Sequence, residues 1–176
     1  RYLHRARELT RRYDVHLIAD EIMTGFGRTG TMFACEQAAI TPDLLCLSKG
    51  ITGGYLPLSC VLATDTVFDA FYDDDVARGF LHSHSYTGNA LACTAANAVL
   101  DLFEKDDVIK ANEHRASRFV KLADALAHHA HVRNFRHLGM IWHSRWWEPA
   151  RSSRRRRSSS PFPAACCCDP SEAPST

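Results

Sequence analysis

An acid, a lysine and a short polar segment could together do chemistry in this sequence. Asp20 ends the apolar stretch "VHLIAD" (15–20), and Lys49 stands near the end of the apolar stretch "DLLCLSKG" (43–50). The segment "HSHSYTGN" (82–89) comes just before a sequence typical of a helix. If the two apolar stretches are strands of an α/β sheet, the acid and the amine lie at the carboxyl ends of strands, where such sheets present their active sites.

A lysine at the end of a buried strand is a candidate for Schiff-base chemistry. Its amine must lose a proton before it attacks a carbonyl, and burial or a nearby cation lowers its pKa. Pyridoxal phosphate needs such a lysine, together with a carboxylate that keeps its ring nitrogen protonated. Lys49 and Asp20 suit these roles, and Thr87 with the N–H groups of a helix from Asn89 would hold the phosphate. Each of these residues also has an ordinary structural explanation. Lys49 could be a solvated lysine, Asp20 could cap a helix or a turn, and Thr87 to Asn89 could be a helix cap.

The glycines within 25–30 have the G-x-G-x-x-G spacing of dinucleotide-binding folds. That fold needs a strand that runs directly into the glycines and a helix that opens at the third one. Here Asp20 and Glu21 stand at the end of the strand, where they would repel a pyrophosphate, and Pro42 ends any helix soon afterwards. We therefore expect the glycines to form a flexible turn beside the site and to bind no nucleotide.

The pattern along the chain predicts an α/β fold. Strands with nearly continuous apolar content are typically buried on both faces, which indicates a parallel or mixed sheet. We expect strands at 15–20, 43–50 and 57–64, a short helix capped by Asp65, a long helix capped by Asn89, a second long helix over 108–130 and a strand beginning at 132.

Bulk properties exclude several classes of protein. The chain has 176 residues and a net charge of +1, so no global field attracts it to nucleic acid or to a membrane surface. No apolar run approaches the length of a membrane span. Seven cysteines without a C-x-x-C pair indicate neither a zinc site nor a disulfide framework, so a cytoplasmic location is expected. The sequence begins within an amphipathic helical pattern, so we expect a fragment of a longer protein.

The character of the sequence changes after Trp142. Residues 1–142 form the body, whereas residues 143–176 collect Arg, Ser, Pro and Cys in runs without periodicity. Such low-complexity composition cannot build a core, so we interpret this tail as disordered or translated out of frame. The alternative is that "RSSRRRRSSS" (151–160) is a nucleic-acid-binding patch.

Three segments of the body resemble the class-III branch of the fold-type I pyridoxal-phosphate aminotransferases. They are "LIADEIMTGFGRTG" (17–30), "PDLLCLSKGITGGYLPLS" (42–59) and "SHSYTGNALACTAANAVL" (83–100). The resemblance extends to about Gly139. It implies that residues 1–142 are part of the cofactor-binding large domain, a three-layer α/β/α structure with a mixed, mostly parallel sheet.

The resemblance also implies roles for single residues. Lys49 would form the Schiff base with pyridoxal 5'-phosphate and carry protons between substrate and cofactor carbons. Asp20 would pair with the pyridine nitrogen, and Ile22 would pack against one face of the ring.

The segment before the long helix would serve phosphate and substrate. By resemblance, Thr87 contacts a phosphate, usually that of the partner subunit's cofactor, which implies a homodimer. Tyr86 would also lie at the phosphate, and Ser85 would lie at the substrate pocket. His82 and His84 could be read as metal ligands, but with no third ligand nearby we expect no metal.

Within the family, the segments "ITGGYLPLSCVLAT" (51–64) and "HSHSYTGNALAC" (82–93) are most similar to the branch that acts in biotin biosynthesis. This implies amino transfer from S-adenosylmethionine to 8-amino-7-oxononanoate, giving 7,8-diaminononanoate. Two alternatives stay open: an aminotransferase of this class that uses ornithine or a similar ω-amine, and an inactive fragment. The second arises because chains of this family are much longer and carry further phosphate and substrate contacts outside the matching segments.

Overall fold

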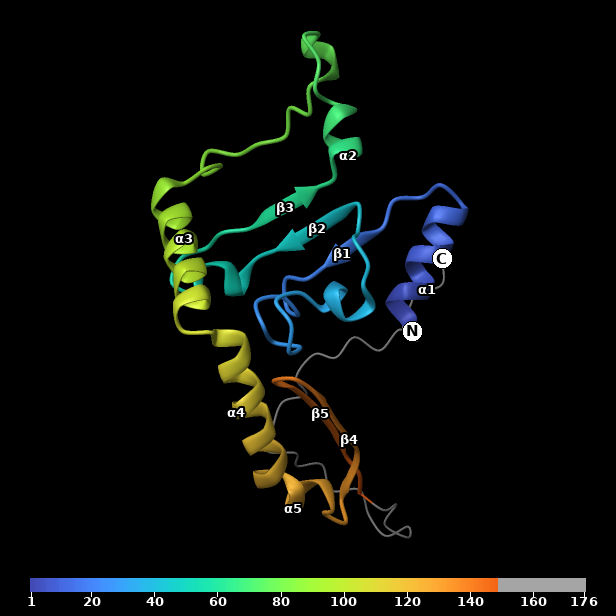
Figure 1. The fold of residues 1–176 in the computed structure, drawn as a ribbon, viewed down its shortest axis with the longest axis vertical. Coiled ribbons are helices and arrows are strands. Elements are labelled where there is room, and N and C mark those ends of the chain that lie inside the picture. Colours follow the sequence, from blue (N-terminus) through green and yellow to red (C-terminus); the bar gives the residue numbers. More distant parts are fainter. Residues whose placement is uncertain (149–176) are drawn as a thin grey trace, which may run out of the picture.

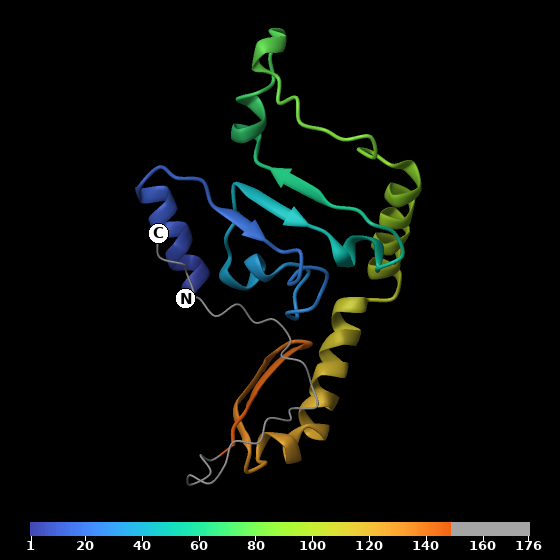
Figure 2. The ribbon, with the colours of Figure 1, turned by 180° about the vertical axis from the view of Figure 1, so that it is seen from behind.

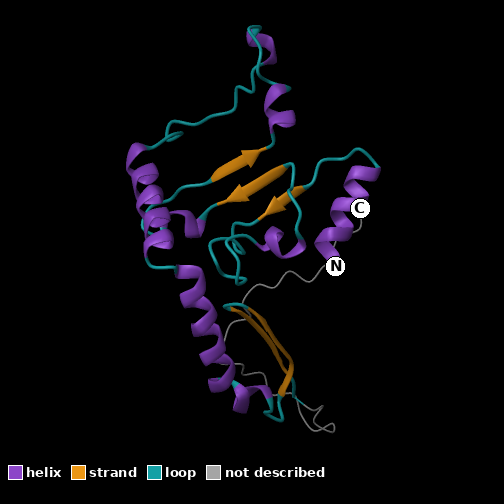
Figure 3. Ribbon diagram, viewed as in Figure 1, coloured by secondary structure: helices purple, strands orange, loops and turns teal. Residues whose placement is uncertain are grey.

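The computed structural model describes residues 1–148, shown with their element labels in Figure 1 and by element type in Figure 3. In chain order, with η for 3-10 helices, the elements are α1 (Tyr2–Arg12), β1 (Ile18–Asp20), η1 (Ala34–Ala38), β2 (Leu44–Leu47), η2 (Lys49–Thr52), β3 (Cys60–Ala63), α2 (Asp65–Asp69), η3 (Val76–Arg78), α3 (Ala90–Lys105), α4 (Val108–Leu122), α5 (Asp124–Ala127), β4 (Val132–Leu138) and β5 (Ile141–Trp146). Among these residues, no helix combines the length and the apolar content that crossing a membrane requires.

The main sheet has the strand order β1-β2-β3. β1 and β2 are parallel, in a register that pairs Ile18 with Leu44 and Asp20 with Cys46. β2 and β3 are antiparallel. The predicted α/β fold with a mixed sheet is confirmed, with one parallel and one antiparallel pairing in the described part of the chain.

The faces of this sheet are more open than the apolar strands led us to expect. Ile18, Val61 and Leu62 are 60%, 57% and 51% exposed. The long helices do not lie flat on the strands, because α3 packs against η2 and α1 against η1. Figures 1 and 2, which view the molecule from opposite sides, show α1 and α3 at opposite ends of the sheet. Burial of the strands on both faces is therefore wrong for these residues.

The core lies where the glycine turn, β2, η2 and α3 meet. Phe26, Leu47, Ile51 and Ala96 form the buried cluster. The rings of Phe33 and Phe103 meet Phe26 edge-on, with centroid separations of 5.9 and 6.1 Å. Aromatic pairs favour this geometry over face-to-face stacking. The core therefore joins the turn after β1 to the segment that follows β2.

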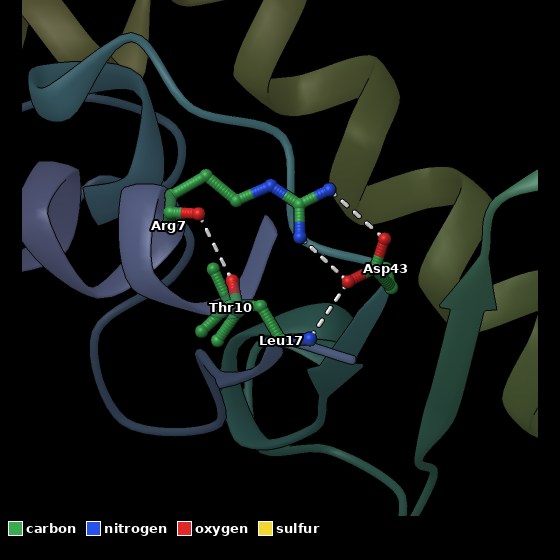
Figure 4. A network of polar contacts seen from close by, with 4 residues as sticks. All are labelled: Arg7, Thr10, Leu17 and Asp43. Atoms are coloured by element: carbon green, nitrogen blue, oxygen red, sulfur yellow. Dashed lines mark hydrogen bonds and ion pairs between the residues drawn. The ribbon is translucent and has the colours of Figure 1, made fainter. Parts of the chain in front are cut away.

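A bidentate ion pair fixes α1 to the start of β2. The two terminal nitrogens of Arg7 donate to the carboxylate of Asp43 at 2.6 and 2.9 Å, and the Leu17 N–H donates to the same carboxylate at 2.7 Å (Figure 4). The hydroxyl of Thr10 donates to the Arg7 carbonyl one turn earlier. The bonds from Arg7 and Leu17 lower the pKa of Asp43 to about 2.

Two helix starts differ in how well the sequence predicted them. Asn89 caps α3 as expected, because its side-chain oxygen accepts the Leu91 N–H at 3.1 Å. Asp65 does not cap α2: it lies in the first turn of the helix, and Thr64 holds the capping position. An acid in the first turn still interacts favourably with the helix dipole.

The single helix expected over 108–130 is two helices, because α4 ends at Leu122 and α5 begins at Asp124.

The strand predicted to begin at residue 132 is half of a hairpin. β4 and β5 pair antiparallel, and Gly139 and Met140 connect them. Gly139 has a φ of +56°, and a Cβ there would lie 2.6 Å from the Arg28 carbonyl oxygen. The Met140 N–H donates to that same oxygen at 2.8 Å, so the hairpin turn is fixed to the glycine turn. β5 crosses the boundary expected at residue 142, and residues 149–176 of the expected tail lie outside the described residues.

Candidate functional site

The carboxyl ends of β1 and β2 bring the predicted acid and amine to one edge of the sheet. Asp20 is the last residue of β1 and pairs with Cys46 of β2. Lys49 lies two residues beyond the end of β2, as the first residue of η2. Because the two strands are parallel, both ends point to the same edge. Both side chains are exposed there, where a ligand could reach them.

The carboxylate of Asp20 is oriented by its own turn. Its Oδ1 atom accepts the Ile22 N–H at 3.0 Å. This bond links the acid directly to the next predicted cofactor residue, since Ile22 supplies the donor. The two residues therefore form one local unit at the end of β1.

Lys49 has an unusual backbone conformation. Its φ is +48°, in the left-handed region that residues with a Cβ seldom adopt. Such a conformation costs on the order of 1–3 kcal/mol and persists only where the surroundings impose it, often at active sites. The Ser48 hydroxyl donates to the Leu58 carbonyl at 2.7 Å on one side of Lys49. On the other side, a Cβ on Gly50 would lie 2.7 Å from Phe26, so only glycine allows η2 to approach the core this closely.

The turn between β1 and η1 is built around Glu21, whose structural role the sequence analysis missed. Glu21 is 2% exposed, and its carboxylate accepts N–H bonds from Ala34 at 3.0 Å and Cys35 at 2.8 Å and a bond from the Thr24 hydroxyl. Burial alone would raise the pKa of Glu21, but these bonds outweigh it and lower the pKa. Burial and Glu21 together raise the pKa of Cys35 to about 11. Strand alternation was the available signal, because it turns Glu21 away from the side that Asp20 faces.

The glycines of this turn do not lead into a long helix. The next helical element is η1, which begins at Ala34, and no helix opens at Gly30. The glycine spacing therefore lacks the strand–turn–helix context that a dinucleotide site requires. This agrees with the prediction of a turn beside the site.

The segment with Ser85, Tyr86 and Thr87 is not brought to the edge that carries Asp20 and Lys49. Every residue from 82 to 87 is exposed. Its hydrogen bonds are local: the Thr87 hydroxyl accepts the His84 N–H at 3.0 Å, and the Thr87 N–H donates to the His84 carbonyl. Figures 1 and 2 show the chain between α2 and α3 standing away from the sheet.

Two further features of residues 1–148 bear on the site. A cavity of about 370 Å³ lies between the glycine turn, α4 and the hairpin turn, and neither Asp20 nor Lys49 lines it. Residues 1–148 contain no group of three or more His, Cys, Asp or Glu side chains placed to hold a metal ion.

Residues 1–155 match the sequence profile of the family Aminotransferase class-III. The chain belongs to the class-III aminotransferases. It is 53% identical over 146 residues to the adenosylmethionine-8-amino-7-oxononanoate aminotransferase of Helicobacter pylori (strain ATCC 700392 / 26695), a match that covers 80% of this chain and 34% of that protein. The family resemblance expected from the sequence is confirmed.

Solved structures of the family agree with the fold. The crystal structure of adenosylmethionine-8-amino-7-oxononanoate aminotransferase from Methanocaldococcus jannaschii DSM 2661 matches with a TM-score of 0.75 and 39% identity, covering 80% of this chain and 33% of that one. A pyridoxal-phosphate-bound amine transaminase from an uncultivated Pseudomonas species matches with a TM-score of 0.72 and 36% identity, covering 78% and 32%. The predicted fold-type I class is thereby confirmed, and the chain spans about a third of the length of these relatives.

Proposed function

We propose that this chain is part of a pyridoxal-phosphate-dependent enzyme that transfers an amino group from S-adenosylmethionine to 8-amino-7-oxononanoate. The observation that carries the proposal is the parallel pairing of β1 and β2, which sets Asp20 and Lys49 at one edge of the sheet. The names of the relatives from Helicobacter pylori and Methanocaldococcus jannaschii supply the reaction. The free cysteines of the described residues fit the cytoplasmic location that belongs to this proposal.

The amine and the acid have the chemistry that the cofactor needs. Pyridoxal phosphate, when bound, supplies a carbonyl that captures amines and a ring that accepts an electron pair. The amine of Lys49 would hold the cofactor through that carbonyl and would move protons between carbon atoms of substrate and cofactor. The carboxylate of Asp20 would keep a proton on the ring nitrogen. The Ile22 side chain would pack against one face of the ring.

Phosphate and substrate contacts fall to the segment before α3. Thr87, with Tyr86 and the first N–H groups of α3, would hold a phosphate, and Ser85 would contact substrate. This segment stands away from the Asp20 edge of its own chain, so we propose that it serves the cofactor of a second copy. A homodimer would then complete two sites at once, with the exposed Tyr86 covered at the interface.

A titration with pyridoxal phosphate tests the cofactor part of this proposal. Binding should produce a visible absorption band with the wild-type chain and none with Lys49→Ala. Lys105→Ala, which removes an exposed lysine at the end of α3, is the matched control and should keep the band. A band that persists in Lys49→Ala would remove the assigned lysine, and a folded wild-type chain without a band would favour the inactive-fragment alternative.

A panel of amino donors tests the substrate. We expect a protein that contains this chain to turn over S-adenosylmethionine and 8-amino-7-oxononanoate. The second candidate is an ornithine or ω-amine aminotransferase, since solved structures of both kinds match at 28–30% identity. Turnover with ornithine and none with S-adenosylmethionine would select that candidate.

A further inference from the structure

Glu21 is an ionisable side chain buried between two residues of the proposed cofactor site. Asp20 precedes it and Ile22 follows it. The buried polar side chains within residues 1–148 are Glu21, Thr29 and Thr52, so Glu21 is the ionisable one among them. Burying a carboxylate is costly unless hydrogen bonds compensate for its lost hydration.

The backbone of Glu21 is bonded on both sides. Its N–H donates to the Cys46 carbonyl at 3.0 Å, which extends the pairing of β1 with β2 by one residue. Its carbonyl accepts the Gly25 N–H at 2.8 Å, which closes the first turn after the strand. Any Cβ on Gly25 would lie 2.8 Å from that carbonyl oxygen, so the turn is tight.

The side chain of Glu21 connects the same point to η1. One carboxylate oxygen accepts the Cys35 N–H, and the other accepts the Ala34 N–H and the Thr24 hydroxyl. The Ala34 and Cys35 N–H groups stand at the start of η1, and the first N–H groups of a helical turn would otherwise be left unpaired. Glu21 therefore joins β2, the glycine turn and η1 at one residue.

The bonds that hold Glu21 also affect the orientation of Asp20, because the two residues are adjacent in the backbone. The Oδ1 atom of Asp20 accepts the Ile22 N–H, so the direction of that carboxylate depends on the peptide that joins Glu21 to Ile22. We propose that Glu21 is a positioning residue: by its bonds to Thr24, Ala34 and Cys35 it fixes residues 20–22 and so orients the carboxylate of Asp20 and the side chain of Ile22. The inference rests on the proposed function for the roles of those two residues.

Nuclear magnetic resonance on the full chain without cofactor tests the positioning itself. The readouts are the hydrogen exchange of the Ile22 amide and the carbon-13 chemical shift of the Asp20 carboxyl at pH 7. In Glu21→Ala, exchange at Ile22 should accelerate by about tenfold or more, and the chemical shift of the Asp20 carboxyl should change. Glu21→Gln keeps the side-chain volume and one acceptor oxygen, so it should show smaller changes of the same sign in a folded chain.

Glu36→Gln is the matched control. Glu36 is an exposed acid of η1 whose carboxylate accepts the Phe33 N–H at 3.0 Å, so the variant alters a carboxylate bond in the same segment. It should leave both Asp20 and Ile22 unchanged. Unchanged Asp20 and Ile22 signals in both Glu21 variants would overturn the proposal.

The second measurement is the affinity of each variant for pyridoxal phosphate. Glu21→Ala should weaken its binding about tenfold, and Glu36→Gln should not. Altered signals at Asp20 and Ile22 with undiminished affinity would also overturn the proposal, because orientation would then not matter to the ligand. A wild-type chain that binds no pyridoxal phosphate, while the Asp20 and Ile22 signals respond to Glu21, would instead reject the proposed function and leave the positioning in place.

Discussion

Replacing Asp43 by asparagine should destabilise the chain strongly at neutral pH and much less in acid. The carboxylate of Asp43 is 17% exposed and the guanidinium of Arg7 is 13% exposed, so solvent screens the pair little. The gap between the usual pKa of 3.8 and the folded value of about 2 corresponds to about 2.5 kcal/mol of unfolding free energy. Because the folded pKa is the lower one, this stabilisation is complete above pH 3.8 and is lost as the pH falls through about 2.

Urea unfolding followed by circular dichroism measures this contribution. At pH 7, Asp43→Asn should lower the unfolding free energy by about 2.5 kcal/mol, and at pH 2 its difference from the wild type should shrink to about 1 kcal/mol or less. Asp69→Asn, on the exposed face of α2, is the control and should not change the urea midpoint. If the difference between Asp43→Asn and wild type were equally large at pH 7 and pH 2, the charge of Asp43 would not be its cause and the prediction would be wrong.

Two further substitutions test packing and capping. Gly50→Ala should cost about 1–3 kcal/mol in urea unfolding and weaken pyridoxal phosphate binding, because its Cβ would meet the buried Phe26 at 2.7 Å; unchanged stability would show that this contact is not tight. Asn89→Ala should lower the unfolding free energy by about 1 kcal/mol, since the Leu91 N–H loses its acceptor, whereas Asn89→Asp should keep the cap; equal losses in both variants would exclude capping as the cause.

The sequence predicted the parts of the molecule that are specified by residues close together in the chain. Asn89 and the Ala- and Leu-rich run after it specify α3 by a cap and by helix propensity, and both are present. The placement of Asp20 and Lys49 at one sheet edge followed from two apolar strands with polar ends, and the β1–β2 register agrees. The roles assigned to these residues remain predictions.

The parts that the sequence did not predict depend on contacts between distant segments. Strand alternation indicates that Glu21 faces away from Asp20, but its bonds to the N–H groups of Ala34 and Cys35, thirteen and fourteen residues later, cannot be predicted from the residues around it. The hairpin of β4 and β5 depends on a turn at Gly139 that fits against Arg28, more than a hundred residues earlier in the sequence. The exposure of Ile18 and Val61 follows from helices that pack against η1 and η2, whereas strand composition alone suggests cover on both faces.

Reductive trapping of pyridoxal phosphate is the most direct test of the site. The chain is incubated with the cofactor, reduced with borohydride so that the cofactor becomes fixed to the amine it has bound, and mapped by peptide mass spectrometry. We predict that Lys49 carries the label and that Asp20→Ala greatly reduces it, while exposed lysines such as Lys105 label weakly at most. Labelling spread evenly over exposed lysines, or labelling of Lys49 that is indifferent to Asp20, would contradict this prediction.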